Sequence, residues 1–117
     1  MIRVALVEDY LPQIQRMEEI LNQIQQEEQL NLQIAVFTDG ESFSALPAHS
    51  FDLALLDIQM DKMDGMEAAA KIREQDEDLI IIFITNLAQY AIQGYAVQAM
   101  DFILKPVNPI LFKEKLM

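Results

Sequence analysis

Cysteine is absent from this chain of 117 residues, which excludes a disulfide framework, a thiolate metal site and a cysteine nucleophile. Basic residues are scarce, because 8 Lys and Arg stand against 19 Asp and Glu, and they form no cluster. Nucleic-acid phosphates are bound by clustered cations, so this segment is not expected to bind nucleic acid directly. The net charge of −11 fits a cation-binding site or a basic partner, although most of it belongs to solvated surface.

Long apolar runs are also missing. The longest, residues 79–84, is far too short to cross a bilayer, and no signal-peptide pattern follows Met1. No internal repeat, linker or low-complexity tract interrupts the chain. A chain of this length with 52% apolar residues can bury a genuine core, so we expect one cytoplasmic domain over residues 1–117, away from membranes.

Strand-like and helix-like segments alternate along the chain. Residues 79–85 are almost continuously apolar, as in a strand covered on both faces. After Pro12, residues Ile14, Met17 and Leu21 recur at helical spacing. The alternation predicts an α/β fold with a parallel sheet. The predicted strands are residues 2–7, 32–38, 53–57, 79–85 and 101–105, and the predicted helices are residues 11–29, 41–46, 66–74, 87–93 and 109–116, the last cut short by the chain end.

Four of the five predicted strands end on a group that can act on phosphate or metal. These groups are Glu8 with Asp9, then Asp57, Thr85 and Lys105. The carboxyl ends of parallel strands share one edge of the sheet, so the groups should converge there. Clustered carboxylates are hard oxygen ligands suited to Mg²⁺, and Asp57 can act as a nucleophile towards phosphorus. Lys105 would neutralise a phosphoryl oxygen as a point charge, and Thr85 offers a hydroxyl.

Each of these residues also has an ordinary interpretation. A lone Asp57 would form a turn or cap a helix, and Asp9 is placed to cap the helix that follows it. Thr85 is a typical β-branched strand residue, and Lys105 taken alone would be a surface residue. His49 lacks a partner pattern and is assigned no role. The four strand-end groups taken together favour a functional site over these separate explanations.

Four motifs, which occur in one order along essentially the whole chain, carry a family resemblance. They are Val7-Glu8-Asp9, then Leu56-Asp57-Ile58-Gln59-Met60 with Met63-Asp64-Gly65, then Phe83-Ile84-Thr85, and finally Asp101-Phe102-Ile103-Leu104-Lys105-Pro106. The chain resembles a response-regulator receiver domain of two-component signalling. The resemblance implies the flavodoxin-like, CheY-like fold, a doubly wound five-stranded parallel sheet with strand order 2-1-3-4-5.

The resemblance implies a phospho-acceptor and a metal site. Asp57 corresponds to the phospho-acceptor, and Glu8 and Asp9 correspond to the acids that bind Mg²⁺. Asp57 itself and the backbone carbonyl of Gln59 complete the implied protein ligands. In the family the residue at Asp61 is usually proline, so the loop after the acceptor is expected to be looser and more acidic here.

The resemblance also implies a switch. Thr85 corresponds to the switch hydroxyl, Phe102 to the switch aromatic and Lys105 to the phosphate-binding lysine, although Phe102 is equally explained as a core residue. The Lys105–Pro106 bond is usually cis in the family. Asn86 stands where a small residue is usual, so it is expected to narrow the approach to the phosphoryl group or to hydrogen-bond it.

The implied function is phosphorylation by a partner histidine kinase, followed by a population shift that changes dimerisation or an attached output domain. The segment 89–107 is similar to receivers joined to LytTR-type DNA-binding domains, so a transcriptional output domain is expected beyond residue 117. Two alternatives remain open. An aspartate-nucleophile phosphohydrolase would need a second acid where Gln59 stands. A phosphorylation-independent pseudo-receiver would not need the complete acid, Thr and Lys set.

Overall fold

The computed structural model describes residues 1–57, 65–85, 101–104 and 107–116, and gives backbone but no side-chain placement for a few of these. Its five strands form one parallel sheet in the order β2-β1-β3-β4-β5, as predicted. The strands are β1 (Ile2–Val7), β2 (Leu32–Phe37), β3 (Leu53–Leu56), β4 (Ile80–Thr85) and β5 (Asp101–Leu104).

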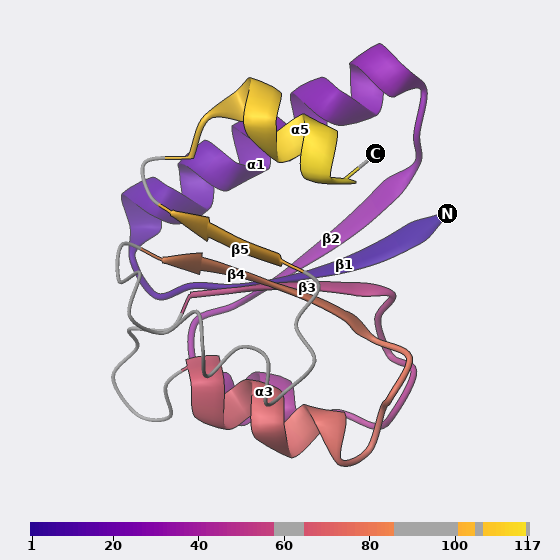
Figure 1. Ribbon diagram of the computed structural model, residues 1–117, viewed down its shortest axis with the longest axis vertical. Coiled ribbons are helices and arrows are strands. Elements are labelled where there is room, and N and C mark those ends of the chain that lie inside the picture. Colours follow the sequence, from indigo (N-terminus) through magenta and orange to yellow (C-terminus); the bar gives the residue numbers. More distant parts are fainter. Residues whose placement is uncertain (58–64, 86–100, 105–106, 117) are drawn as a thin grey trace.

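Helices cover both faces of this sheet (Figure 1). One face carries α1 (Leu11–Glu28) and α5 (Pro109–Leu116), and the other carries α2 (Gly40–Ser44) and α3 (Gly65–Arg73). These bounds lie within two residues of the predicted ones, and the helix predicted over residues 87–93 falls outside the described residues. None of the described helices has the length and apolar character needed to cross a membrane.

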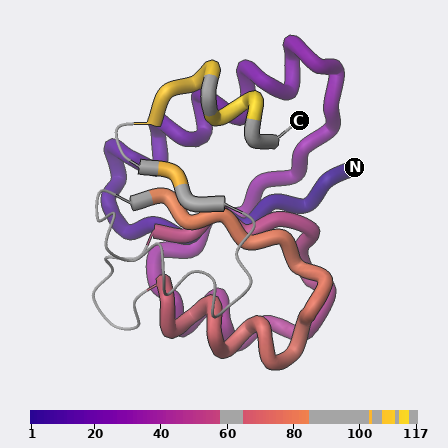
Figure 2. The backbone as a smooth tube through the Cα atoms, viewed as in Figure 1, coloured from indigo at the N-terminus to yellow at the C-terminus, as the bar shows by residue number. Residues whose placement is uncertain are grey.

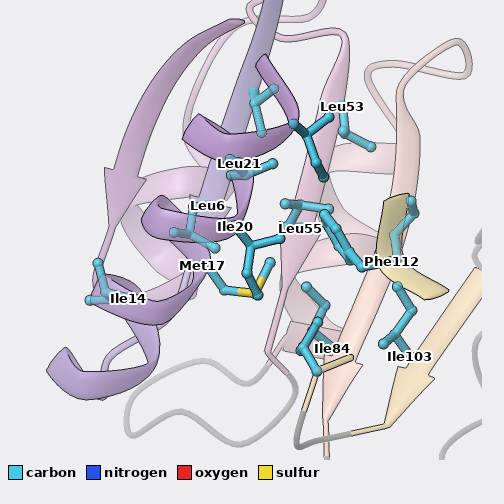
Figure 3. Close-up of a cluster of buried hydrophobic side chains, with 14 residues drawn as sticks. Leu6, Ile14, Met17, Ile20, Leu21, Leu53, Leu55, Ile84, Ile103 and Phe112 are labelled. Carbon is cyan, nitrogen blue, oxygen red and sulfur yellow. The ribbon is translucent and has the colours of Figure 1, made fainter. Parts of the chain in front are cut away.

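Alternation along the strands sorts the apolar side chains into two cores. In β1, Val4 and Leu6 belong to the core under α1 and α5, whereas Ala5 and Val7 belong to the core under α2 and α3. This division follows from the two-residue period of a strand. Figure 3 shows the first core, where side chains from α1, the sheet and α5 meet, among them Met17 and Phe112.

Helix α1 begins without a side-chain cap. Its N-cap residue is Tyr10, which makes no side-chain capping hydrogen bond, and Pro12 occupies the first turn. The suggestion that Asp9 caps this helix is therefore wrong. The helix ends at Gln29, which adopts the left-handed conformation (φ 54°) and donates its N–H to the Gln25 carbonyl.

Two ion pairs join helix α5 to the C-terminal end of α1. Lys113 Nζ lies 2.8 Å from Glu27 Oε2 and 2.7 Å from Glu28 Oε1, although these residues are far apart in sequence. Figure 2 shows the purple helix of the N-terminal half and the yellow C-terminal helix side by side. Lys113 holds the pKa of the Glu27 carboxyl below its usual range through a hydrogen bond, so this contact weakens in acid.

At the amino edge of the sheet, an ion pair joins β1 to the residue before β3. Asp52 accepts hydrogen bonds from the Arg3 guanidinium (3.2 and 3.3 Å) and from the Arg3 backbone N–H (2.8 Å). The Arg3 guanidinium and backbone N–H hold the pKa of Asp52 below its ordinary value of 3.8. A lowered folded-state pKa stabilises the fold above the ordinary value, and this stabilisation is lost as pH falls through the folded-state pKa.

This ion pair gives a pH prediction. Replacing Asp52 with Asn should lower the free energy of unfolding slightly near neutral pH, because the pair is largely exposed. The difference from wild type should shrink as the pH falls below 3.8, the ordinary value for this carboxyl. Urea unfolding of both proteins across the acid range measures it. If the difference in unfolding free energy stayed constant or grew in acid, the ion pair of Asp52 with Arg3 would not be its cause.

Candidate functional site: an acidic pocket at the carboxyl edge of the sheet

Two carboxylates stand at the point where the strand order reverses. The chain runs from β1 outward to β2 and then returns past β1 to β3, so the carboxyl ends of β1 and β3 flank the crevice where such sheets bind ligands. Glu8 directly follows β1 and Asp57 directly follows β3. Because Val7 pairs with Leu56 in register, the two acids are cross-strand neighbours.

Backbone hydrogen bonds fix both residues. The Glu8 N–H donates to the Phe37 carbonyl of β2 (2.9 Å), and the Asp57 N–H donates to the Val7 carbonyl of β1 (3.0 Å). The backbone hydrogen bonding between strands thus continues one residue past the end of β1 and of β3. Strand β3 itself ends at Leu56, one residue before the predicted end at Asp57. Glu8 and Asp57 are only 2% and 7% exposed.

Asp9 completes a group of three acids. One carboxylate oxygen from each of Glu8, Asp9 and Asp57 lies within 4.8 Å of the others, with Asp9 exposed and the other two buried. Three carboxylates at this spacing repel one another when ionised, and a cation between them relieves the repulsion. This arrangement brings together the three acids that the sequence placed at strand ends.

The donor set fits Mg²⁺. All three side chains offer hard oxygen ligands, which Mg²⁺ prefers, and the exposed Asp9 leaves the group open to the solvent that supplies its remaining water ligands. No soft sulfur ligand and no imidazole belongs to this group of described residues, which speaks against a site built for zinc or copper.

A small cavity lies behind the acids. It has a volume of ≈ 10 Å³, the size that holds one water molecule. Its walls come from β1, β3, β4 and α1. The lining residues are Leu6, Val7, Glu8, Gln13, Met17, Leu55, Asp57 and Ile84.

The other predicted site residues are placed only in part. Thr85 is the last residue of β4 and pairs in register with Leu104, so its backbone lies at the carboxyl end of the sheet. Phe102 pairs with Phe83, so its backbone lies on the edge strand β5. Their side chains lie outside the described part of the structure, as do Lys105 and Gln59 altogether. Asp61, Asn86 and the Lys105–Pro106 bond also lie outside it.

A second group of possible metal ligands, missed from the sequence, lies at the amino edge. His49, Asp76 and Asp78 offer ligand atoms within 4.8 Å of one another. The buried Asp76 is already engaged, because Oδ2 accepts the His49 N–H (2.9 Å) and Oδ1 accepts the N–H groups of Asp78 and Leu79 (both 3.1 Å). His49 Nδ1 lies 3.5 Å from Asp76 Oδ1. We assign Asp76 a structural role: it ties the loop before β3 to the loop after α3.

Comparison with known families decides what this scaffold is. The family model of the response regulator receiver domain matches residues 4–117. The chain belongs to this family. A solved complex of CheX and CheY with BeF₃ and Mg²⁺ from Borrelia burgdorferi contains a chain similar to this receiver domain, with a TM-score of 0.79 and 27% identity, covering 99% of this chain and 87% of that one.

The relatives of this receiver domain include a transcriptional regulatory protein and a sensory transduction protein. Bacillus subtilis NatR is 32% identical over 108 residues, which cover 91% of this chain and 44% of NatR. Oceanobacillus iheyensis LytT, a sensory transduction protein, is 34% identical over 98 residues, which cover 82% of this chain and 40% of LytT. The chain thus spans less than half the length of these relatives. The predicted family, two-component signalling class and fold are confirmed.

Proposed function

We propose that this receiver domain takes a phosphoryl group from a histidine kinase onto Asp57 in the presence of Mg²⁺. The observation that carries the proposal is the juxtaposition of Glu8, Asp9 and Asp57 at the strand-reversal point of a receiver fold. Mg²⁺ held by these acids and by the Gln59 carbonyl would neutralise the charge of the incoming phosphoryl group.

The chemistry required of Asp57 is a single displacement. A carboxylate oxygen attacks the phosphorus of phosphohistidine in line, a P–O bond forms, and the imidazole nitrogen leaves with the electrons of the broken P–N bond. Lys105 and Thr85 are proposed to bind the phosphoryl oxygens, since each follows or ends a strand at the same sheet edge. Hydrolysis of the acyl phosphate, with water attacking phosphorus, restores the carboxylate and resets the domain.

The proposed consequence is a switch of the domain's surface. New bonds from Thr85 to the phosphoryl group and repacking of Phe102 would shift the population between two packings of one fold. The changed surface would control a phosphorylation-dependent homodimer or a C-terminal output domain. The transcriptional regulatory protein NatR among the relatives supports a DNA-binding output, for which the LytTR type is our proposal.

Exposed apolar residues offer a docking surface for the kinase. Tyr10 and Leu11, which follow Asp9, are 64% and 61% exposed. A partner that covers them would bring its phosphohistidine to the open side of the acidic group. We place this exchange in the cytoplasm, where histidine kinases present their phosphohistidine.

Incubation with a small acyl phosphate such as acetyl phosphate tests the proposal. With Mg²⁺ the intact mass should increase by one phosphoryl group, and with excess EDTA in place of Mg²⁺ the increase should disappear, because charge neutralisation is most of the catalysis. Labelling that persists in EDTA, or no labelling in either condition, would refute the proposal. Continuous turnover of a general phosphatase substrate would instead support a phosphohydrolase.

A further inference from the structure

Gln13 is a polar residue on the inward stripe of α1. It precedes Met17 by four residues, which is about one helical turn, so the two side chains lie on the same side of the helix. Met17 is 1% exposed and belongs to the core between α1 and the sheet. Gln13 therefore stands at the end of this core that is nearest the strand ends, where the cavity behind the acids lies.

The alternation of side chains between the two faces of the sheet turns the buried acids Glu8 and Asp57 towards the same cavity. Leu6 and Leu55 face α1, and Glu8 and Asp57 follow them by two residues, so the period of a strand turns these carboxylates towards α1 as well. The cavity is accordingly lined by Gln13 together with both acids. The amide and the carboxylates thus share one small space.

The amide of Gln13 has a hydrogen-bond donor in that space that is not paired with any described residue. Its Nε2 atom is buried and has no hydrogen-bond partner among the described residues. A buried amide donor without a partner is costly, and such groups in native proteins are usually satisfied by an ordered water. The cavity of ≈ 10 Å³ has room for one.

We propose that Gln13 is a positioning residue of the acidic site, acting through a water molecule held in this cavity. The water accepts a hydrogen bond from Gln13 Nε2 and donates its two protons to the carboxylates of Glu8 and Asp57, which fixes their orientation for the cation. Partners of this kind, one step removed from a metal, orient the ligands and raise metal affinity. The inference rests on the proposed Mg²⁺ site.

Calorimetric titration of the 117-residue protein with MgCl₂ tests this role. Gln13→Met keeps the length of the side chain and removes the donor, so the affinity for Mg²⁺ should fall by about tenfold. The matched control is Gln15→Met, the same change at an exposed position of α1, which should leave the affinity unchanged. Melting temperatures measured without Mg²⁺ establish that the variants are folded.

The outcomes separate the two proposals. Loss of affinity in Gln13→Met with none in Gln15→Met supports the positioning role, whereas equal affinities in all three proteins overturn it and leave the Mg²⁺ site standing. A wild-type protein that does not bind Mg²⁺ overturns the proposed function itself. Should Gln13→Met not fold, Gln13→Ala decides, because alanine is a good helix former and also lacks the donor: its affinity for Mg²⁺ should again fall, and an affinity equal to that of the wild type would overturn the positioning role.

Discussion

Asp57→Asn should abolish the mass increase that we expect acetyl phosphate and Mg²⁺ to produce in the wild-type protein. The amide of asparagine has nearly the shape of the carboxylate but lacks the anionic oxygen that attacks phosphorus. Asp9 is exposed and Glu8 is held on the neighbouring strand, so neither replaces the acceptor at the end of β3. Intact-mass spectrometry after a fixed incubation measures the effect.

The two ends of β3 supply the control. Asp52 precedes this strand and Asp57 follows it, so Asp52→Asn makes the same chemical change at the opposite edge of the sheet. Its labelling should equal that of the wild type. Asp57→Asn should also be more stable than the wild type without Mg²⁺, by about 1 kcal/mol, because it removes one of three neighbouring negative charges. Labelling that survives in Asp57→Asn would show that another residue is the acceptor.

Asp76→Ala should lower the free energy of unfolding by about 3 kcal/mol, which is a large part of the stability of a typical domain. Asp76 is 3% exposed and accepts the backbone N–H groups of His49, Asp78 and Leu79. Alanine leaves these three donors without their partner, and each lost partner in a buried site costs about 1 kcal/mol or more. His49 also loses the contact that holds its left-handed backbone (φ 64°).

Urea unfolding of two matched variants isolates this cause. Asp78→Ala removes an exposed carboxylate two residues away and should change the free energy of unfolding by less than about 0.5 kcal/mol. Asp76→Asn keeps one oxygen for the Asp78 and Leu79 donors but turns an amide N–H₂ towards the His49 N–H, so its loss should be intermediate. If Asp76→Ala were as stable as Asp78→Ala, the structural role of Asp76 would be wrong.

Local patterns explain why most of the fold could be predicted. Strand and helix periods are properties of short segments, and all nine described elements lie within two residues of their predicted bounds. The errors lie at the ends of elements. The helix predicted over residues 41–46 begins one residue earlier, at Gly40, because Asp39 is the N-cap of α2 and accepts the Ser42 N–H. Asp9 does not cap α1, because the N-cap position is occupied by Tyr10.

The sequence by itself determined the order of the elements and the presence of acids at the ends of β1 and β3, since both depend on residues that are adjacent in the chain. Only the tertiary structure decided which side chains meet. Asp76 binds His49 across 27 positions, and the Gln13 amide reaches the cavity shared by Glu8 and Asp57 through the packing of α1 on the sheet. Such contacts are set by how helices cross the sheet, and no periodicity within a segment records that geometry.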